Sequence, residues 1–179
     1  MSLEFTILGF LNKGPKTGYE LQKKIEKSIN HFWTSTQSQI YRTLNKLAED
    51  ALIVSEIHYQ DEKPNKKVYT ITERGKDELI RWLSSPINIP NHRNPFLVQL
   101  FFSGDNIDKE TIKSNLHHYK KEMERRLFFL KSNEAKLMVE SANSKIEYLI
   151  YQSLINNGIC LLQSEINWVD ESLQKIEAL

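Results

Sequence analysis

The sequence of 179 residues contains a single cysteine, Cys160, so no intrachain disulfide can form. Such sparing use of cysteine fits a reducing compartment. No uncharged apolar run approaches the roughly 18 residues that a membrane-spanning helix needs. The first four residues, Met1 to Glu4, lack the basic segment of a signal peptide. We therefore expect a cytoplasmic protein without a transmembrane helix.

The short motifs of common enzyme classes are missing as well. The chain has no Gly-x-Ser-x-Gly, no Walker loop, no His-Glu-x-x-His and no Gly-x-Gly-x-x-Gly. None of its histidines has a cysteine or carboxylate at a convincing metal-ligand spacing, so structural or surface roles are expected for them. They are His31, His58, His92, His117 and His118. The sequence thus predicts no enzyme, no catalytic residue, no metal site and no cofactor.

The composition is that of an ordinary soluble globular protein, with 40% hydrophobic and 26% charged residues. The net charge is +1, and it is spread almost evenly. Residues 1–82 hold 13 Lys and Arg against 11 Asp and Glu, and residues 83–179 hold 11 against 12. This asymmetry does not by itself indicate nucleic-acid binding, but a DNA-binding protein needs only a local basic patch.

Apolar residues recur at spacings near 3.6, which predicts a mainly helical chain. Helices are expected over residues 3–12, 19–28, 35–49, 73–83, 96–102, 108–138 and 145–179. Between the third and fourth helices the pattern changes to that of a small β-hairpin, with strands at 52–59 and 68–71. Prolines at 86, 90 and 95 mark a linker. We expect domains at 1–84 and 96–179, joined by residues 85–95.

Three helices followed by a hairpin form the layout of a winged helix-turn-helix. A DNA major groove admits one helix, which must present polar side chains on its outer face. The expected third helix does so with Ser38, Gln39, Arg42, Thr43, Asn45 and Lys46. The hairpin tip carries residues suited to phosphate contacts, namely Lys63, Asn65, Lys66 and Lys67. Winged helices also serve as protein-interaction modules, so an alternative function without DNA binding stays open.

Several segments carry a resemblance to a known family. They read Ile-Leu-Gly-Phe-Leu at 7–11, Gly-Pro-Lys-Thr-Gly-Tyr-Glu-Leu at 14–21, Phe-Trp at 32–33, Ser-Gln-Ile-Tyr-Arg-Thr-Leu at 38–44 and Lys-Val-Tyr-Thr-Ile-Thr-Glu-Arg-Gly at 67–75. In this combination the sequence resembles the PadR family of transcriptional regulators. The C-terminal half, with Gly158, Glu165 and Trp168, resembles more loosely the virulence-activator-like α-helical domain of its longer subfamily.

This resemblance implies a repressor that binds a palindromic operator as a homodimer. It implies DNA contacts from Tyr19, Ser38, Gln39, Tyr41 and Thr43, with Lys66 and Lys67 on the wing. Two residues depart from the family pattern. Arg42 replaces a common proline and adds a cation to the recognition helix. Ala51 replaces a glycine that often ends this helix, where a positive φ would cost alanine more.

The resemblance also implies release by a small aromatic, phenolic-type effector. Aromatic residues that could line an apolar cleft between the two domains are Trp33, Tyr148, Tyr151 and Trp168, together with Tyr19. Aromatic residues at helical spacing are also common in ordinary cores, so this alternative stays open. Cys160 lies in a helix expected to be buried, where a thiol behaves as a small apolar group.

The last predicted helix carries an apolar seam with alternating spacings of four and three, as in a coiled coil. Its members are Ile155, Ile159, Leu162, Ile166, Val169, Leu173 and Ile176. The helix before it has a similar stripe, so the two can pack as an antiparallel pair. Further apolar residues lie off the seam, and their burial favours a second subunit. We assign the seam to a dimer interface; the alternative is packing against the chain's own winged helix.

Overall fold

The computed structural model describes residues 2–29, 33–59, 65–86, 93–132 and 139–178. The chain divides into two compact units, residues 1–89 and 90–179. Helices dominate both, and the strands form one small antiparallel sheet in the first unit. The expected fold class, mainly α with a small β-hairpin, is therefore confirmed. The linker expected at 85–95 lies largely outside the described residues, and the assignment of a role to each domain stays a prediction.

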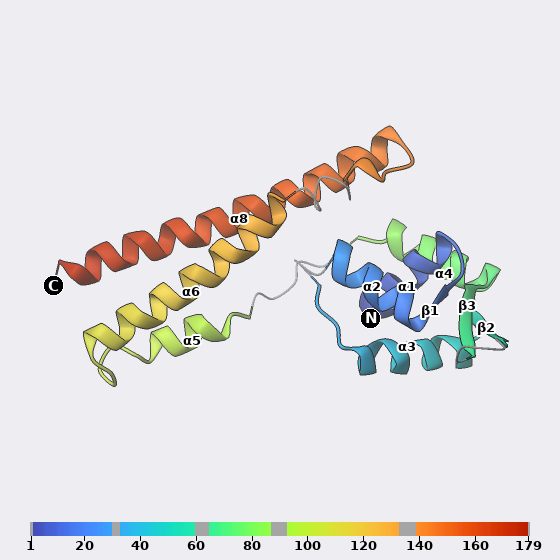
Figure 1. Cartoon of the computed structure of the whole chain (residues 1–179), viewed down its shortest axis with the longest axis horizontal. Coiled ribbons are helices and arrows are strands. Elements are labelled where there is room, and N and C mark those ends of the chain that lie inside the picture. Colours follow the sequence, from blue (N-terminus) through green and yellow to red (C-terminus); the bar gives the residue numbers. More distant parts are fainter. Residues whose placement is uncertain (1, 30–32, 60–64, 87–92, 133–138, 179) are drawn as a thin grey trace. The chain divides into compact units, whose positions relative to one another are not determined.

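The described part of the N-terminal unit holds four helices and three short strands, whose arrangement Figure 1 shows. They are α1 (Ser2–Asn12), β1 (Lys16–Thr17), α2 (Gly18–Ser28), α3 (Gln37–Glu49), β2 (Ile53–His58), β3 (Lys66–Ile71) and α4 (Glu73–Ser84). The strand order is β1-β3-β2, so the expected hairpin of β2 and β3 has a third strand beside it. Lys16 of β1 pairs with Tyr69 of β3. A strand of two residues has no readable period, so the sequence did not predict it.

The core of this unit is built by the apolar stripes of its first three helices. Each side chain is at most 2% exposed: Ile7, Leu8, Leu11, Leu21, Ile25, Ile40, Leu44 and Leu47. The members of each helix are three or four residues apart, which places them on one helical face. Burying a side chain of this size contributes roughly 1.5–3 kcal/mol. These contacts fix α3 against α1 and α2 and turn its opposite face outward.

Both ends of α3 are closed by local hydrogen bonds. At the start, the backbone amide of Gln39 donates to Thr36 Oγ1 (3.3 Å), and the amide of Thr36 donates to Gln39 Oε1 (2.9 Å). This capping box begins the helix at Gln37, two residues later than the sequence suggested. At the other end, the amide of Leu52 donates to the carbonyl of Leu47 (2.9 Å). Together with φ +54° at Ala51, this is a Schellman turn.

The turn after α3 also anchors the start of α4. The hydroxyl of Thr72 lies 3.0 Å from the carbonyl oxygens of Ala51 and Leu52 and accepts a hydrogen bond from the amide of Gly75. Thr72 is thus the N-cap that the sequence predicted. Gly75 sits so close to this turn that a Cβ there would lie 2.1 Å from the carbonyl oxygen of Leu52. Only glycine fits this position without a backbone shift.

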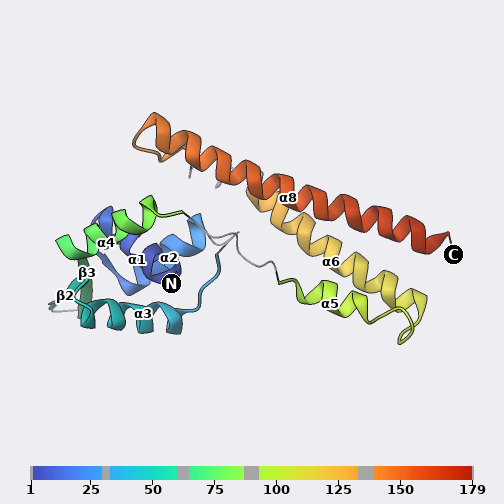
Figure 2. The ribbon, with the colours of Figure 1, turned by 180° about the vertical axis from the view of Figure 1, so that it is seen from behind.

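The C-terminal unit consists mainly of two long antiparallel helices that lie side by side in both views (Figures 1 and 2). Its described helices are α5 (Pro95–Phe101), α6 (Lys109–Leu130) and α8 (Lys145–Glu177). Polar contacts follow the antiparallel register, because Lys113 reaches Glu177 (2.7 Å) and Lys120 reaches Asp170 (2.5 Å). The helix expected over 108–138 ends earlier, at Leu130, where Lys131 forms its C-cap. Residues 133–138 of that expectation lie outside the described residues.

The apolar seam of α8 is covered within the chain itself. Ile155, Ile166 and Val169 are buried, and the remaining seam residues, Ile159, Leu162, Leu173 and Ile176, are half-buried. They face α6, whose Leu116, Met123 and Leu130 are also buried. The seam thus packs against α6 of the same subunit, and its assignment to a dimer interface stays a prediction.

Replacing Gly75 with alanine should destabilise the N-terminal unit by about 3 kcal/mol, since the new Cβ would overlap a backbone oxygen that cannot rotate away. Gly9→Ala is the matched control, because Gly9 lies inside α1 with nothing within 4 Å of a Cβ. It should stabilise the protein by about 0.5–1 kcal/mol. Urea unfolding of both variants measures the difference. Equal effects would contradict the close approach at Gly75.

Ala51→Gly should stabilise the protein by about 1 kcal/mol. It removes the cost of a left-handed backbone in alanine, which exceeds the added entropy of a glycine in the unfolded chain. Ala48→Gly, three residues earlier within α3, should have the opposite sign because glycine weakens a helix interior. Thermal unfolding followed by circular dichroism compares the two, and a lower Tm for Ala51→Gly would refute the argument.

Candidate nucleic-acid interface

The outward face of α3 is polar. Ser38, Arg42 and Asn45 are exposed, and their spacing of four and three places them on one side of the helix. This side lies opposite the buried stripe of Ile40, Leu44 and Leu47. The helix runs along one edge of the N-terminal unit, with the β2–β3 hairpin at its end (Figure 1). The residues predicted from the sequence as a DNA-reading face therefore do share an accessible surface.

Two of the predicted contact residues on α3 already make bonds within the helix. Gln39 uses its side-chain oxygen in the capping box, so only its amide N–H groups stay available. A bidentate contact to adenine needs both the oxygen and an N–H, and would require the cap to open. Thr43 donates its hydroxyl to the carbonyl of Gln39 (2.8 Å) and keeps acceptor capacity. Neither can act as a full donor–acceptor pair without rearrangement.

Two tyrosines lie where α2 meets α3. The ring of Tyr41 covers Gly18, where a Cβ would be 2.7 Å from its Cε1 atom. Tyr41 remains 39% exposed, and Tyr19 is 62% exposed. The ammonium group of Lys23 lies 5.7 Å from the centre of the Tyr19 ring. Both tyrosines are therefore accessible from solvent, and the DNA contacts that the resemblance implies for them stay a prediction.

The start of α2 is fixed by a second capping box. The backbone amide of Thr17 donates to Glu20 Oε2 (2.7 Å), and the amide of Glu20 donates to Thr17 Oγ1 (3.2 Å). The amide bond from Thr17 is the main reason why the pKa of Glu20 is lowered, and its hydroxyl adds to the effect. The charge of Lys66 on the wing lowers this pKa further. The wing lysine and the first turn of α2 are therefore electrostatically linked.

Lys46 is held by an ion pair. Its ammonium group lies 2.5 Å from Glu4 Oε1 of α1, and this hydrogen bond raises the pKa of Lys46. The side chain of Lys46 is still 60% exposed, so solvent screens the pair and its contribution to stability is small. Its consequence is positional, because a cation predicted to contact DNA is directed towards α1.

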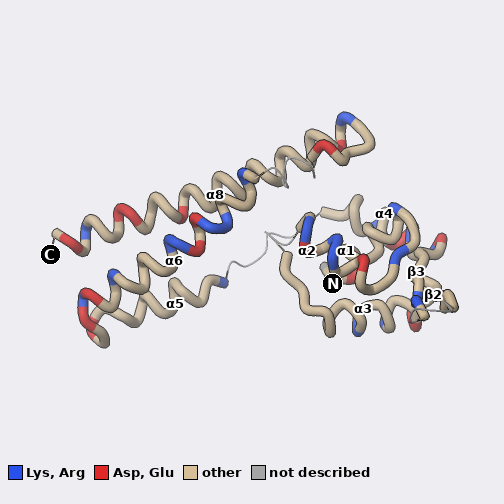
Figure 3. Tube along the Cα trace, viewed as in Figure 1, with Lys and Arg blue, Asp and Glu red and all other residues tan. Residues whose placement is uncertain are grey.

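The wing carries the other basic residues. β2 and β3 pair from Ile53 with Ile71 out to His58 with Lys66, at the described end of the hairpin. Asn65, Lys66 and Lys67 are exposed there, and basic positions mark both α3 and this hairpin (Figure 3). The Lys67 ammonium lies 5.4 Å from the centre of the Tyr69 ring. The predicted contact from Lys63 lies outside the described residues.

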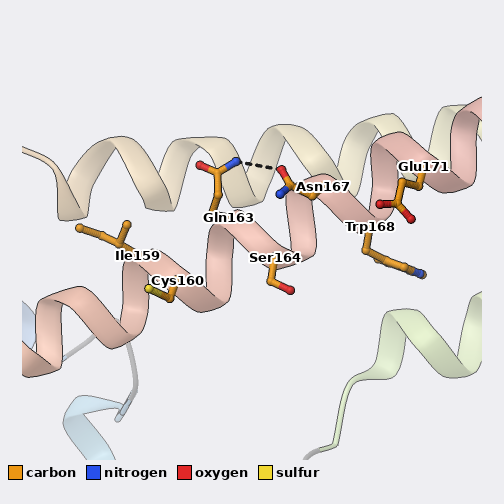
Figure 4. Close-up of a pocket in the computed structure, with 7 residues that line it drawn as sticks. All are labelled: Ile159, Cys160, Gln163, Ser164, Asn167, Trp168 and Glu171. Atoms are coloured by element: carbon orange, nitrogen blue, oxygen red, sulfur yellow. Dashed lines mark hydrogen bonds between the residues drawn. The ribbon is translucent and has the colours of Figure 1, made fainter.

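The four aromatic residues predicted to line an effector cleft do not line one cavity within either unit. Trp33 borders a cavity of about 230 Å³ in the N-terminal unit. Trp168 borders one of about 590 Å³ lined only by residues of α8 (Figure 4). Tyr148 is exposed, and Tyr151 is half-buried and donates to Glu147 Oε1 (2.5 Å). The shared cleft therefore stays a prediction.

Cys160 also lines the cavity on α8, in contrast to the burial expected for it. The residue is exposed because it lies beside the seam that faces α6, one position beyond the half-buried Ile159. Among the described residues, no three His, Cys, Asp or Glu side chains are grouped as metal ligands would be. Within the same part of the chain, no helix combines the length and apolar character that crossing a bilayer requires.

A helix-turn-helix followed by a basic β-hairpin defines the winged-helix class of folds. The model of the transcriptional regulator PadR-like family matches residues 7–81. A second model, virulence activator alpha C-term, matches residues 92–177. The chain belongs to the PadR-like family of transcriptional regulators and carries the longer type of C-terminal domain.

Named relatives agree with this assignment. A probable transcriptional regulator of Mycobacterium tuberculosis, Rv1176c, is 39% identical over 88 residues, 49% of this chain and 47% of that one. The negative transcriptional regulator PadR of Bacillus subtilis is 36% identical over 101 residues, 56% of each chain. The matches thus span about half the length of these relatives. The crystal structure of Bacillus subtilis PadR with operator DNA matches 98% of this chain and 99% of its own, with a TM-score of 0.81 and 26% identity.

Proposed function

We propose that this protein represses transcription by binding a palindromic DNA operator as a homodimer. The observation that carries the proposal is the outward polar face of α3, with Ser38, Arg42 and Asn45 exposed above a fully buried stripe. A helix held rigidly in this way can enter a major groove without refolding. The operator complex of Bacillus subtilis PadR, a protein of the same overall fold, supports this use of the surface.

The available side chains differ in the kind of DNA contact that they suit. Arg42 is the one most suited to reading a base, since a guanidinium can donate twice to the O6 and N7 atoms of guanine. Lys66 and Lys67 on the wing suit phosphate contacts, which position the protein without reading sequence. Ser38, Tyr41 and Tyr19 present hydroxyl groups that can serve either purpose. Gln39 and Thr43 keep only part of their hydrogen-bonding capacity while their internal bonds hold, and Lys46 is engaged by Glu4.

Dimerisation follows from apolar residues that the α6–α8 seam leaves uncovered. They are Phe128, Phe129, Ile146, Leu149, Ile150, Leu154 and Leu161, all exposed in the single chain. Soluble monomers rarely leave large apolar patches in contact with water. A second subunit of the same sequence would bury these residues and give the two-fold symmetry that a palindromic operator requires.

Release by a small aromatic effector and a cytoplasmic location complete the proposal. Bacillus subtilis PadR has also been solved with p-coumaric acid, which is a property of that protein. Access to chromosomal DNA requires the cytoplasm, which fits the single cysteine. The competing function, a winged helix that holds other proteins, would leave Arg42, Lys66 and Lys67 without a polyanionic partner. It predicts no binding to any promoter fragment.

DNA fragments selected from a genomic pool by the purified protein provide the test, followed by affinity measurements on the best of them. Arg42→Ala should cost about 1–3 kcal/mol, a loss of roughly five- to 150-fold, if Arg42 reads a base. Lys66→Ala and Lys67→Ala should each reduce the log–log salt slope by up to about 0.9. Arg81→Ala on α4 is the matched control for loss of one charge and should change little. If no fragment is enriched, the interaction-module alternative replaces this function.

Glu4→Gln should tighten DNA binding, since it frees Lys46 for a phosphate contact. The salt slope should steepen by up to about 0.9, which corresponds to one more neutralised phosphate. Glu49→Gln, an exposed carboxylate on α3 itself, is the control for removing one negative charge near DNA. If both variants change the slope equally, the effect is general electrostatics and the Lys46–Glu4 pair has no special role.

A further inference from the structure

The first residue of α2, Gly18, is buried beneath a side chain of α3. A Cβ built on Gly18 would lie 2.7, 2.8 and 2.9 Å from Cε1, Cζ and the hydroxyl oxygen of Tyr41. The Tyr41 ring therefore occupies the space that a side chain at position 18 would need. The φ angle of Gly18 lies outside the left-handed region, so the backbone conformation does not require a glycine. The requirement for glycine comes from the ring alone.

The backbone at Gly18 is held on both sides. Before it, Thr17 pairs with Val68 of β3. After it, the amide of Glu20 donates to Thr17 Oγ1 (3.2 Å), which closes the first turn of α2 around Gly18. A methyl group added at position 18 must therefore be accommodated by the Tyr41 side chain, whose torsions can change. The nearest atoms are the end of a side chain, so an alanine variant is expected to fold.

The Tyr41 ring also lies near β3. Burial is the main reason why the pKa of Tyr69 on β3 is raised, and the neighbouring Tyr41 raises this pKa further. Tyr69 is only 3% exposed, whereas Tyr41 keeps 39% of its surface exposed. The Tyr41 hydroxyl thus lies where α2, α3 and β3 meet, within reach of another molecule.

We propose that Gly18 is a positioning residue for DNA recognition: it lets the Tyr41 ring lie against α2, and this contact fixes where the Tyr41 hydroxyl meets DNA. The inference rests on the proposed function, in which Tyr41 contacts the operator. A phenol donates and accepts hydrogen bonds, and these weaken steeply when their distance and angle change. A methyl group at position 18 therefore impairs the contact although the contacting residue itself is intact.

The operator affinity of Gly18→Ala tests this role. Gly9→Ala within α1 is the matched control, because a Cβ there has nothing within 4 Å. We expect Gly18→Ala to bind the best genomic fragment about three- to tenfold more weakly, as for the loss of one hydrogen bond, and Gly9→Ala to bind like the wild type. The log–log salt slope should stay unchanged, since no cation is lost. Equal affinities of the two variants, or a shallower slope for Gly18→Ala, would overturn the role.

A double-mutant cycle with Tyr41→Phe separates positioning from a general disturbance of α2. Tyr41→Phe keeps the ring but removes the hydroxyl, so adding Gly18→Ala to it should weaken operator binding by less than about twofold. If Gly18→Ala weakens binding equally in both backgrounds, the glycine does not act through the Tyr41 hydroxyl and the proposal is wrong.

The position of the ring is measured without DNA by fluorine NMR on the full chain labelled with fluorotyrosine, in which Tyr41→Phe identifies the Tyr41 signal. Gly18→Ala should shift this signal and leave that of Tyr148 on α8 in place. An unmoved Tyr41 signal would refute the proposal. If the wild type binds no operator, the proposed function fails and the positioning role with it. If the wild type binds and Gly18→Ala binds equally well, the positioning role alone is lost.

Discussion

The packing of Ile40, Leu44 and Leu47 of α3 against α1 and α2 is the contact on which the rest of the N-terminal unit depends. It decides which side of α3 faces water, and so which residues can reach another molecule. The same helix is closed at its end by the Schellman turn at Ala51, and that turn carries the N-cap of α4 through Thr72. The core, the end of α3 and the start of α4 are therefore linked, so a substitution in one of them is expected to affect the others.

Several side chains on the outward face of α3 already make contacts within the chain. Gln39 caps its own helix, Lys46 pairs with Glu4, and Arg42 borders the cavity beside Trp33. Each of these side chains also belongs to the proposed DNA face. Because a hydrogen-bond donor can serve one strong acceptor at a time, DNA affinity depends on what else these residues hold. The ion pair with Glu4, for example, engages the ammonium group of Lys46 within the chain itself.

In the C-terminal unit, the packing of two helices decides which apolar residues are covered and which stay exposed. The heptad-like seam of α8 closes onto α6 of the same chain, which leaves the neighbouring stripe with Leu154 and Leu161 exposed. A sequence shows how many apolar faces a helix has but not which partner covers each of them. For this reason the sequence did not show how far α6 covers the seam, and Cys160, one position beside it, was expected to be buried although it is exposed.

The sequence by itself determined the order of helices, the β2–β3 hairpin, the cap at Thr72 and the polar face of α3, because these depend on local periodicity and on neighbours three or four residues apart. It also indicated the family. It did not reveal strand β1, the pairing of Lys46 with Glu4 across 42 positions, or the cavity that gathers Leu3 and Arg42. Those features join residues distant in the chain, and only the pairing of β1 with β3 and the packing of α1 against α3 bring them together.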